Sequence, residues 1–316
     1  MSILSTYASI DVGGPCKIKD GGLYYYFENG VKITPQPVWR ALPSTLGGES
    51  DDNLVDLTYK ISGTPKSVWK ATTPQAVSYA AAFMPDALVN FSYTGVPLLG
   101  ATNNVVNIIS TNAKGFDFKR CVLTKMPTVY YGLGKPLWGE VEWTGFWQNG
   151  FALNDAAAFY AENTTAWVQT DYPVDHQEQM AQLIWGAVSG WTSVFAEEGF
   201  SHSHESKLQP VKQGNVTVDM KVLGYRAMLA FKPQQPTTTQ LLAALALQGA
   251  SGGIGTRRSA NANDAVISLD GSTAFITLKK MGVRTGVFEF DNKLNRHGDF
   301  TLVTAQTTPG TRIVIA

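Results

Sequence analysis

The sequence has few charged residues, and the charges that it has cancel. Charged side chains make up 16% of 316 residues, with 25 Lys and Arg against 25 Asp and Glu. A protein that wraps nucleic acid needs a basic face, and one that binds an anionic membrane needs clustered Lys and Arg, so the composition favours neither partner. The longest apolar run, at residues 241–247, is too short for a helix that crosses a bilayer.

Cysteine is nearly absent as well. Cys16 and Cys121 are the two in the chain, too few for a disulfide framework in a protein of this length, which favours a reducing compartment. Residues 1–15 have neither the basic start nor the apolar core of a secretory signal peptide. The sequence therefore predicts a protein that is made and folded in a cytoplasm.

The sequence also lacks the common motifs of nucleotide binding and nucleophilic catalysis. The glycine-rich residues 249–258 end in Arg257-Arg258 rather than in the Lys-Ser/Thr pair of a phosphate loop, and a helix rather than a strand is expected before them. Residues 190–199 do not fit the Gly-x-Ser-x-Gly pattern of a serine nucleophile. We expect no enzyme and no cofactor, and we interpret residues 249–263 as a loop whose two arginines can dock on an acidic neighbouring subunit.

One histidine pair is a candidate for metal binding. His202 and His204 would share one face of a strand, as two metal ligands can. Zinc needs three or four ligands, and the other histidines of the chain are His176 and His297. The simpler interpretation is an exposed polar strand without a metal.

Acidic and aromatic residues leave two further alternatives open. Glu140 and Glu142 could serve a glycan-cleaving enzyme, but general acid–base catalysis needs one carboxyl with a raised pKa in a cleft. Because both share one face of an expected strand, the simpler interpretation is a solvated or lumen-facing surface. The eight tryptophans could form the platform of a carbohydrate-binding or adhesion module, although aromatic residues also concentrate in cores and subunit interfaces.

The sequence is rich in β pattern. Hydrophobic residues make up 44% of the chain, enough for one large β domain or two ordinary ones. Apolar–polar alternation and β-branched residues predict strands at residues 30–35, 54–61, 105–109 and 116–124. Prolines and Gly47-Gly48 predict a loop over residues 36–53. Short helices are expected after Thr73 and over residues 239–245.

The stretch at residues 122–144 occurs a second time at residues 275–303. Each copy begins with a strand that ends in a Lys-Met pair, Lys125-Met126 or Lys280-Met281, then crosses a glycine-bearing loop and ends in a second strand. The segments before each copy follow the same order, so that residues 199–211 match 22–35 and residues 215–222 match 54–61. An internal repeat of this kind predicts two similar domains.

The repeat sets the expected domain boundaries. We expect a first β domain with an N-terminal arm at residues 1–150, a helical connector at 151–189 and a second β domain at 190–316. The connector is expected to contain one helix from Asn154 to Glu162 and another from Asp175 through Trp185. The predicted fold class is mainly β, a sandwich or barrel-forming fold with short flanking helices, in two similar domains in tandem.

With this order of elements, the chain resembles phage tail tube proteins. The motifs that carry the resemblance extend over most of the chain: GVKITP at 30–35, ISGTP at 61–65, LTKMP at 123–127, GW to EEGF at 190–200, LQPV at 208–211 and GNVTVDM at 214–220. The resemblance implies a β-sandwich with a flanking helix that oligomerises into stacked rings, whose inner sheets join into one barrel around a channel for DNA. It also implies a structural virion protein of the tail, assembled in the host cytoplasm.

The repeat changes the number of chains expected in a ring. Open strand edges recruit other chains, and ring closure removes those edges. If both halves are tube domains, three chains form a homotrimer with pseudo-sixfold symmetry; a homohexamer with one tube domain and one decoration domain is the fallback. A near-neutral channel lets DNA pass during ejection without holding it. The expected partners are further copies of the chain and the tape-measure, terminator and tail-tip proteins.

This arrangement gives expected roles to individual residues. The connections at 40–53, 127–139, 249–263 and 282–297 would reach a neighbouring subunit or the next ring. Their expected contact residues are Pro127, Tyr130, Tyr131, Lys135, Arg257, Arg258, Lys293 and Arg296. The residues expected to face the lumen are Lys125, Glu140, Glu142 and Lys280.

Overall fold

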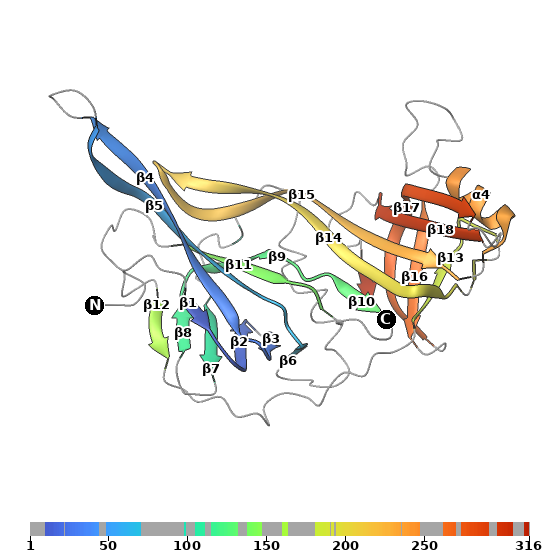
Figure 1. Ribbon diagram of the computed structural model, residues 1–316, viewed down its shortest axis with the longest axis horizontal. Helices are drawn as coiled ribbons and strands as arrows, with labels where there is room; N and C mark the ends of the chain where they lie inside the picture. Colours follow the sequence, from blue (N-terminus) through green and yellow to red (C-terminus); the bar gives the residue numbers. More distant parts are fainter. Residues whose placement is uncertain are drawn as a thin grey trace.

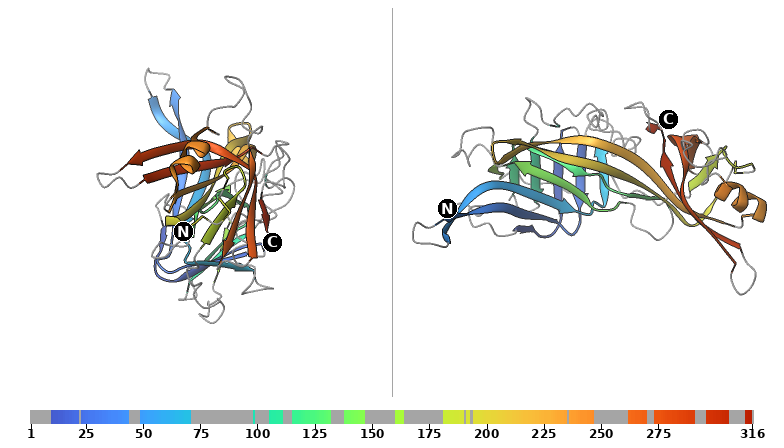
Figure 2. Two further views of the ribbon diagram at one scale, coloured as in Figure 1. Left: turned by 90° about the vertical axis from the view of Figure 1, so that its right-hand side faces the viewer. Right: turned by 90° about the horizontal axis from the view of Figure 1, so that it is seen from above.

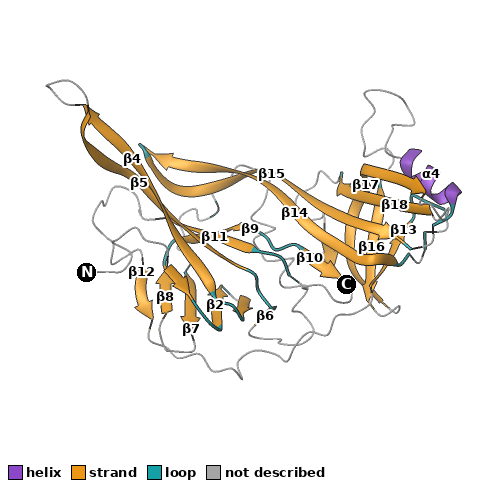
Figure 3. Ribbon diagram, in the orientation of Figure 1, coloured by secondary structure: helices purple, strands orange, loops and turns teal. Residues whose placement is uncertain are grey.

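Most of the described chain is β-strand. The computed structural model describes residues 10–21, 23–43, 49–70, 98, 105–110, 115–131, 138–146, 160–163, 181–189, 191–192, 194–234, 236–246, 262–269, 273–290, 296–305 and 313–315. Within these residues the strands form three sheets, accompanied by one helix (Figures 1 and 3). The mainly β fold predicted from the alternation is confirmed.

Two antiparallel sheets of the first half pack face to face. Sheet A has the strand order β1-β4-β5-β11-β9, and sheet B has the order β12-β8-β7-β2-β3-β6. The strands of sheet A are β1 (Ile10–Val12), β4 (Val31–Pro43), β5 (Glu49–Gly63), β9 (Cys121–Lys125) and β11 (Val141–Phe146). Those of sheet B are β2 (Cys16–Asp20), β3 (Leu23–Phe27), β6 (Ser67–Lys70), β7 (Val106–Ser110), β8 (Gly115–Phe118) and β12 (Tyr160–Asn163).

Alternating side chains build the core between sheets A and B. On β5, Tyr59 and Ile61 are fully buried and the residues beside them are not, because successive side chains of a strand point to opposite faces. Trp143 of β11 contacts Tyr25 edge-on, with 4.9 Å between the ring centroids, and its Nε1 donates a 2.8 Å hydrogen bond to the Asp20 carboxylate. The indole N–H of Trp143, the only polar group of this buried side chain, is therefore hydrogen-bonded.

Sheet C forms most of the second half. Its order is β10-β14-β15-β18-β17-β16-β13, with β19 paired to β17. Its strands are β10 (Val129–Tyr131), β13 (Ala181–Trp185), β14 (Ala196–Gln213), β15 (Val216–Pro233), β16 (Asn263–Leu269), β17 (Thr273–Phe290), β18 (Arg296–Thr304) and β19 (Ile313–Ile315). The first part of β17 pairs with β16 and β19, and the second part pairs with β18. The corner between them is at Lys280, whose φ of 48° is rare for a residue with a side chain.

A second aromatic core and the helix α4 (Thr238–Ala246) complete this half. Trp191 lies 5.8 Å from Phe231 and 5.6 Å from Phe300 between ring centroids. Thr237 precedes α4 and forms a capping box with Gln240: each accepts a hydrogen bond at its side chain from the backbone N–H of the other, at 3.2 and 3.0 Å. The helix predicted at residues 239–245 is confirmed.

The helical connector predicted at 151–189 is not helical where the structure describes it. Residues Tyr160–Asn163 form β12, and Ala181–Trp185 form β13, so the helix predicted through Trp185 is wrong over that segment. Leu183 and Trp185 are fully buried while Ile184 is 39% exposed, a period of two that belongs to a strand. The expected helix after Thr73 lies outside the described residues.

The predicted loop at 36–53 is also wrong in its described part. β4 runs unbroken from Val31 to Pro43, and β5 begins at Glu49. A proline nitrogen cannot donate to a neighbouring strand, but the described part of β1 pairs with β4 only as far as Ile33. Pro35, Pro37 and Pro43 occupy alternate positions and therefore turn their nitrogens toward the same edge, where none of the described strands pairs with them.

The two halves have the same strand order. The order β1-β4-β5-β11-β9 of sheet A recurs in sheet C as β10-β14-β15-β18-β17. The order β12-β8-β7-β2 of sheet B recurs as β19-β17-β16-β13. The chain therefore builds one arrangement twice, and the two sheets that are separate in the first half are joined in the second half by the long strand β17.

Irregular features recur at equivalent positions as well. Gly30 and Gly199 have φ of 79° and 78°. Each directly precedes the residue at which β4 or β14 begins to pair with its other neighbour, Val31 with Val12 of β1 and Phe200 with Tyr131 of β10. The hairpin β4–β5 has register shifts after Val38 and Leu42, and the hairpin β14–β15 has them after Lys207 and Val211. These pairs are each separated by 169 residues, since 207 minus 38 and 211 minus 42 give the same difference.

The structural register corrects the repeat proposed from sequence. Ile33 pairs with Ile61 in the first hairpin, and His202 pairs with Leu229 in the second. Gly199 therefore corresponds to Gly30, not to residue 22, and residues 215–222 correspond to 47–54 rather than to 54–61. The repeat predicted from sequence aligned similar residue types. The register is instead set by hydrogen bonds and β-bulges, which cannot be recognised from residue types.

Candidate assembly surface

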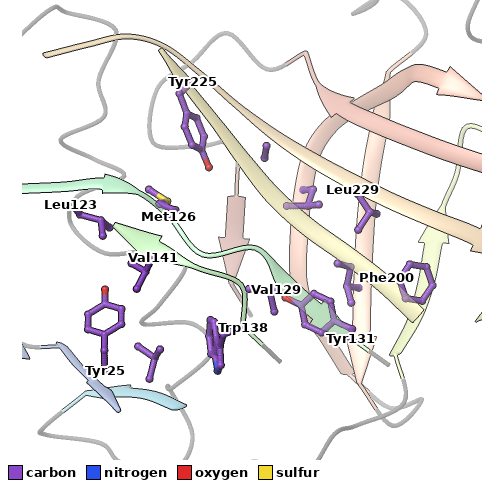
Figure 4. Packing of buried hydrophobic residues seen from close by; sticks show 14 of the residues in the cluster. Tyr25, Leu123, Met126, Val129, Tyr131, Trp138, Val141, Phe200, Tyr225 and Leu229 are labelled. Carbon is purple, nitrogen blue, oxygen red and sulfur yellow. The ribbon is translucent and has the colours of Figure 1, made fainter. Parts of the chain in front are cut away.

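One segment of the first half links sheets A and C. β9 pairs with β11 in sheet A, and after three residues the chain continues as β10, which pairs with β14 in sheet C. Figure 4 shows Leu123, Met126 and Val129 along this path, from the core of the first half to Phe200 and Leu229 of the second. Met126 and Val129 are buried. Sheets A and C are therefore joined covalently and by strand pairing.

The position of β10 corrects the role predicted for residues 127–131. Tyr131 pairs with Phe200 and is buried, and Pro127 is buried as well. Tyr130 is half-exposed and lines a shallow cleft with Lys232 and Asp299. These residues hold together the two halves of one chain, because the alternation at 129–131 makes a strand rather than a loop. Trp138 forms a bridge with Val129 and is buried beside it.

The face of sheet A that is turned away from sheet B is largely polar. Neighbouring side chains on it make hydrogen bonds across the strands: Thr58 to Gln36 at 3.4 Å and Thr144 to Thr124 at 3.2 Å. Cross-strand polar pairs of this kind stabilise a sheet whose face is not covered. We call this surface the outer face of sheet A.

Four of the charges on this face form a balanced network. Lys125 Nζ lies 2.7 Å from Glu140 and 3.5 Å from Glu142, and Lys60 Nζ lies 2.8 Å from Glu142. The hydrogen bond from Lys125 lowers the pKa of Glu140, and the same bond raises the pKa of Lys125. Two positive and two negative charges cancel on this surface. A general acid needs a raised pKa, whereas the pKa of Glu140 is lowered.

The predicted residues of the second half have mixed outcomes. Lys280 is exposed at the corner of β17, and its backbone N–H donates to Asp264 at 3.0 Å. Arg296 begins β18 and pairs with Phe290, so the loop predicted at 282–297 is a strand pair in its described part. The remaining predicted contact residues, Lys135, Arg257, Arg258 and Lys293, lie outside the described residues.

The histidine pair is interior, which corrects the prediction of an exposed strand. His202 is fully buried, and its ring lies 4.5 Å from that of His204 between centroids. The His204 Nδ1 and the Tyr225 hydroxyl share a hydrogen bond. Burial lowers the pKa of both imidazoles, that of His204 to about 3, so both rings are neutral at pH 7. In the part of the chain that is described, no three His, Cys, Asp or Glu side chains gather around a metal position.

The far end of hairpin β14–β15 lies against the first half of the same chain. Thr217 donates to the Asp56 carboxylate from its backbone N at 3.1 Å and from its Oγ1 at 2.6 Å. The Arg120 guanidinium donates to the Val218 carbonyl at 3.3 Å. Burial lowers the pKa of Arg120, while the negative charge of Asp219 acts in the opposite direction. Polar and ionic contacts therefore fix the hairpin on sheet A.

Apolar contacts support the same interface. Val122 and Phe146, at the ends of β9 and β11, are buried on the outer face of sheet A, and Met220 of the hairpin packs against them. The Leu98 backbone N–H donates to the Met220 carbonyl at 2.7 Å. None of these contacts was predicted, because a pairing between positions about 100 residues apart has no local sequence signal.

The far end of the other long hairpin carries exposed apolar side chains. Hairpin β4–β5 projects beyond the rest of the molecule, as Figures 1 and 2 show. Its large apolar residues Val38, Trp39 and Leu42 are 50%, 49% and 41% exposed. Neighbouring exposed apolar residues on a projecting strand are typical of a contact surface.

The comparisons with known proteins add little. No protein-family model and no curated protein matches the sequence. A chain of the solved structure "Tail of empty GTA particle computed with helical refinement, C6 symmetry" is weakly similar, with a TM-score of 0.29 and 9% sequence identity, over 46% of this chain and 99% of that one. A similarity of this strength shows neither the assembly nor the partners of this chain. None of the described helices is long and apolar enough to cross a membrane.

Proposed function

We propose that this chain is a structural protein of a phage tail that polymerises into stacked rings and forms the tail tube. The observation that carries the proposal is the repeated order of sheets A and C, joined through β9 and β10 into one wall. Two linked sheets of this kind can close into a barrel when further copies extend them, and closure leaves no open strand edge.

The repeat sets the proposed stoichiometry. Each chain supplies two wall segments of the same strand order, so three chains supply six. The proposed ring is a homotrimer with pseudo-sixfold symmetry, built from head-to-tail contacts that close by rotation. The two tandem β domains predicted from sequence belong to this proposal. β10 crosses between them, because a strand of the first half pairs with β14 of the second.

The polar outer face of sheet A is the proposed lining of the channel. The network of Lys60, Lys125, Glu140 and Glu142 has no net charge. A positive lining would bind DNA phosphates tightly and in a salt-dependent manner, whereas a neutral one lets DNA slide through during ejection. The protein is proposed to act in the virion after assembly in the host cytoplasm, without a cofactor, membrane contact or enzymatic role. Its other proposed partners are the tape-measure, terminator and tail-tip proteins.

The experiment that tests this function is electron microscopy of the purified protein, together with its mass in solution. We expect rings or tubes with a central hole, and a smallest closed particle of three chains by native mass spectrometry. A protein that stays monomeric at high concentration refutes the proposal. A closed particle of six chains supports the tube and replaces the trimer with the homohexamer.

The sugar-binding alternative receives no support from the tryptophans whose side chains the structure describes. Trp138, Trp143, Trp185 and Trp191 are at most 2% exposed and belong to the cores. Trp39 is half-exposed, but a platform for sugar rings needs aromatic faces that are open to solvent together. We therefore keep one proposed function.

A further inference from the structure

We propose that the projecting end of hairpin β4–β5 docks on the second half of a neighbouring copy of this chain, in the way that hairpin β14–β15 docks on the first half of its own chain. The inference rests on the proposed ring and names the contact that closes it. Figure 1 shows the two long hairpins extending in the same direction, the second over the first half and the first beyond the end of the molecule.

The two hairpins match residue by residue over their described pairs, as far as Pro43 with Glu49 and Lys212 with Thr217. In the second hairpin, Val211 pairs with Asp219 and a register shift follows at Lys212. In the first, Leu42 pairs with Asp51 and a register shift follows at Pro43. Asp51 therefore corresponds to Asp219, with the same side chain. Asp51 is exposed, whereas Asp219 is 3% exposed at the contact with the first half.

The surfaces that receive the hairpins also match. The Phe146 backbone N–H donates to the Arg120 carbonyl at 2.9 Å, where the chain turns from β8 into β9. The Ala305 backbone N–H donates to the Lys280 carbonyl at 2.8 Å, at the corner of β17. Lys280 therefore corresponds to Arg120 and is an exposed cation at the same corner.

The matched positions carry charges of the same sign in both halves. Within the chain, the cation is Arg120, whose hydrogen-bond acceptor Val218 is next in sequence to the anion Asp219. Between chains, the cation is Lys280 and the anion is Asp51. The Arg120 guanidinium also donates to a backbone carbonyl, that of Val218, and this acceptor exists at the matching position for any side chain. The pair of charges can therefore recur between copies without further sequence identity.

Other parts of the internal contact do not recur. Gly224 stands where the first half has Asp56, since Lys207 pairs with Gly224 as Val38 pairs with Asp56. The two hydrogen bonds from Thr217 thus have no counterpart between copies. Leu208, the match of Trp39, packs against the core and is less exposed than Trp39. Docking would cover the larger Trp39 ring in the same way, which accounts for an exposed indole on a projecting strand.

The direction of the contact suits a ring. The projecting hairpin and the corner of β17 lie at opposite ends of the molecule in Figure 1, so one copy cannot satisfy both. A contact between two different surfaces is heterologous, and repeated by a rotation it closes a ring without a free end. The second copy is therefore the occupant of each end.

A charge-reversal series tests the contact by sedimentation velocity and electron microscopy. Asp51→Lys and Lys280→Asp should each raise the concentration at half-assembly about tenfold or more, as close charge pairs at interfaces do. The double variant Asp51→Lys/Lys280→Asp should recover most of the wild-type assembly. Lys66→Glu, which reverses one partner of the exposed 3.3 Å pair with Glu28, is the matched control and should assemble normally.

The outcomes separate the contact from the proposed function. Absence of rings in the wild-type protein refutes the tube and the contact together. Rings that form equally well in both single variants refute the contact and leave the tube standing. Because a charge reversal can disturb folding, Lys280→Gly is the second test: its backbone suits a φ of 48°, so it should fold normally and still assemble poorly.

Cross-linking gives a readout that does not depend on affinity. The variant Asp51→Cys/Lys280→Cys should form disulfides between chains, and a non-reducing gel should show a ladder that ends at three chains. The native thiols give little background, because Cys16 and Cys121 are fully buried and burial raises the pKa of both. Ring-forming protein that yields only monomers under oxidation refutes the contact, and each single-cysteine variant is the control.

Discussion

The substitution Thr217→Val should weaken the contact between the two halves of the chain, because Thr217 makes two hydrogen bonds to Asp56 across it. The Thr217 Oγ1 donates at 2.6 Å to the carboxylate of Asp56, a residue that is only 8% exposed. Valine keeps the shape and the backbone hydrogen bond at 3.1 Å but removes the hydroxyl. A hydrogen bond to a charged acceptor contributes about 1.5–3 kcal/mol, so the free energy of unfolding should fall by about that amount.

Urea unfolding followed by tryptophan fluorescence measures this change. Trp143 packs against Tyr25 in the first half, and Trp191 packs against Phe231 in the second, so both halves contribute to the signal. Loss of the link should lower the midpoint and broaden the transition toward two steps, because the halves then unfold with less coupling. Asp56→Ala should cost at least as much, since it leaves both Thr217 donors without this acceptor.

Thr144→Val is the matched control for this change. Its hydroxyl donates to Thr124 at 3.2 Å on the same outer face, a neutral pair that should be worth about 1 kcal/mol or less. If Thr217→Val unfolds at the same urea concentration as wild type, or no lower than Thr144→Val, then the Asp56 contact does not hold the hairpin on sheet A. The template for the proposed contact between copies would then lose its energetic basis.

Four further outcomes follow from the structure. Lys280→Gly should leave the melting temperature of the monomer unchanged or raise it, because the left-handed region costs a residue with a Cβ about 1–2 kcal/mol while glycine loses about 0.5–1 kcal/mol in chain entropy. Trp39→Ser should shift the monomer by no more than about 0.5 kcal/mol, yet reduce the ring fraction in sedimentation velocity, because the indole is half-exposed until docked. Native protein should resist a thiol reagent at pH 8 and react at both cysteines once unfolded, and rapid native reaction would contradict the burial of Cys16 and Cys121. The matching position 33 carries isoleucine, so His202→Ile is the natural substitution. Burial depresses the folded pKa of both imidazoles, so the stability present above pH 6.5 is lost as pH falls, by up to about 1.4 kcal/mol per pH unit per histidine. The variant should therefore lose less stability than wild type between pH 6.5 and pH 4.

Local pattern was enough to predict the elements that have one buried face. The strand predicted at 54–61 lies within β5, the strand at 105–109 is β7, and the helix at 239–245 is α4. In each case a period of two or of 3.6 matches the burial of alternate or successive-turn residues. A single buried face is a property of a short segment, and a short segment is what a sequence pattern can report.

Elements whose conformation depends on distant partners were missed. Prolines in β4 predicted a loop because they cannot donate, but their edge of the strand has no described partner beyond Ile33. The 127–131 segment was predicted to reach outward, but β14 of the second half pairs with it. His202 was predicted to be exposed because it is polar, but its position is that of Ile33 in the first hairpin and is interior. Each error therefore concerns contacts with distant segments, or a strand edge without a described partner, and a local sequence pattern reports neither.

The residues at the two matched contacts differ in a way that fits one permanent and one assembled interface. Within the chain, Val122 and Phe146 receive Met220, and they are covered as soon as the chain folds. The matching positions in the second half are Gly282 and Ala305, and Asp52 stands in place of Met220. A free subunit that exposed valine, phenylalanine and methionine there would aggregate through them.

Charge is the safer means of recognition for a subunit that must remain soluble before it assembles. Lys280 and Asp51 are exposed and well solvated in the free chain, and in the proposed contact they would steer and orient two copies. Assembly that depends on them should weaken as salt rises, because exposed charges are screened beyond about 8 Å at physiological ionic strength. Ring formation that is unchanged between low and high salt would instead indicate that Trp39 and its apolar neighbours supply most of the contact.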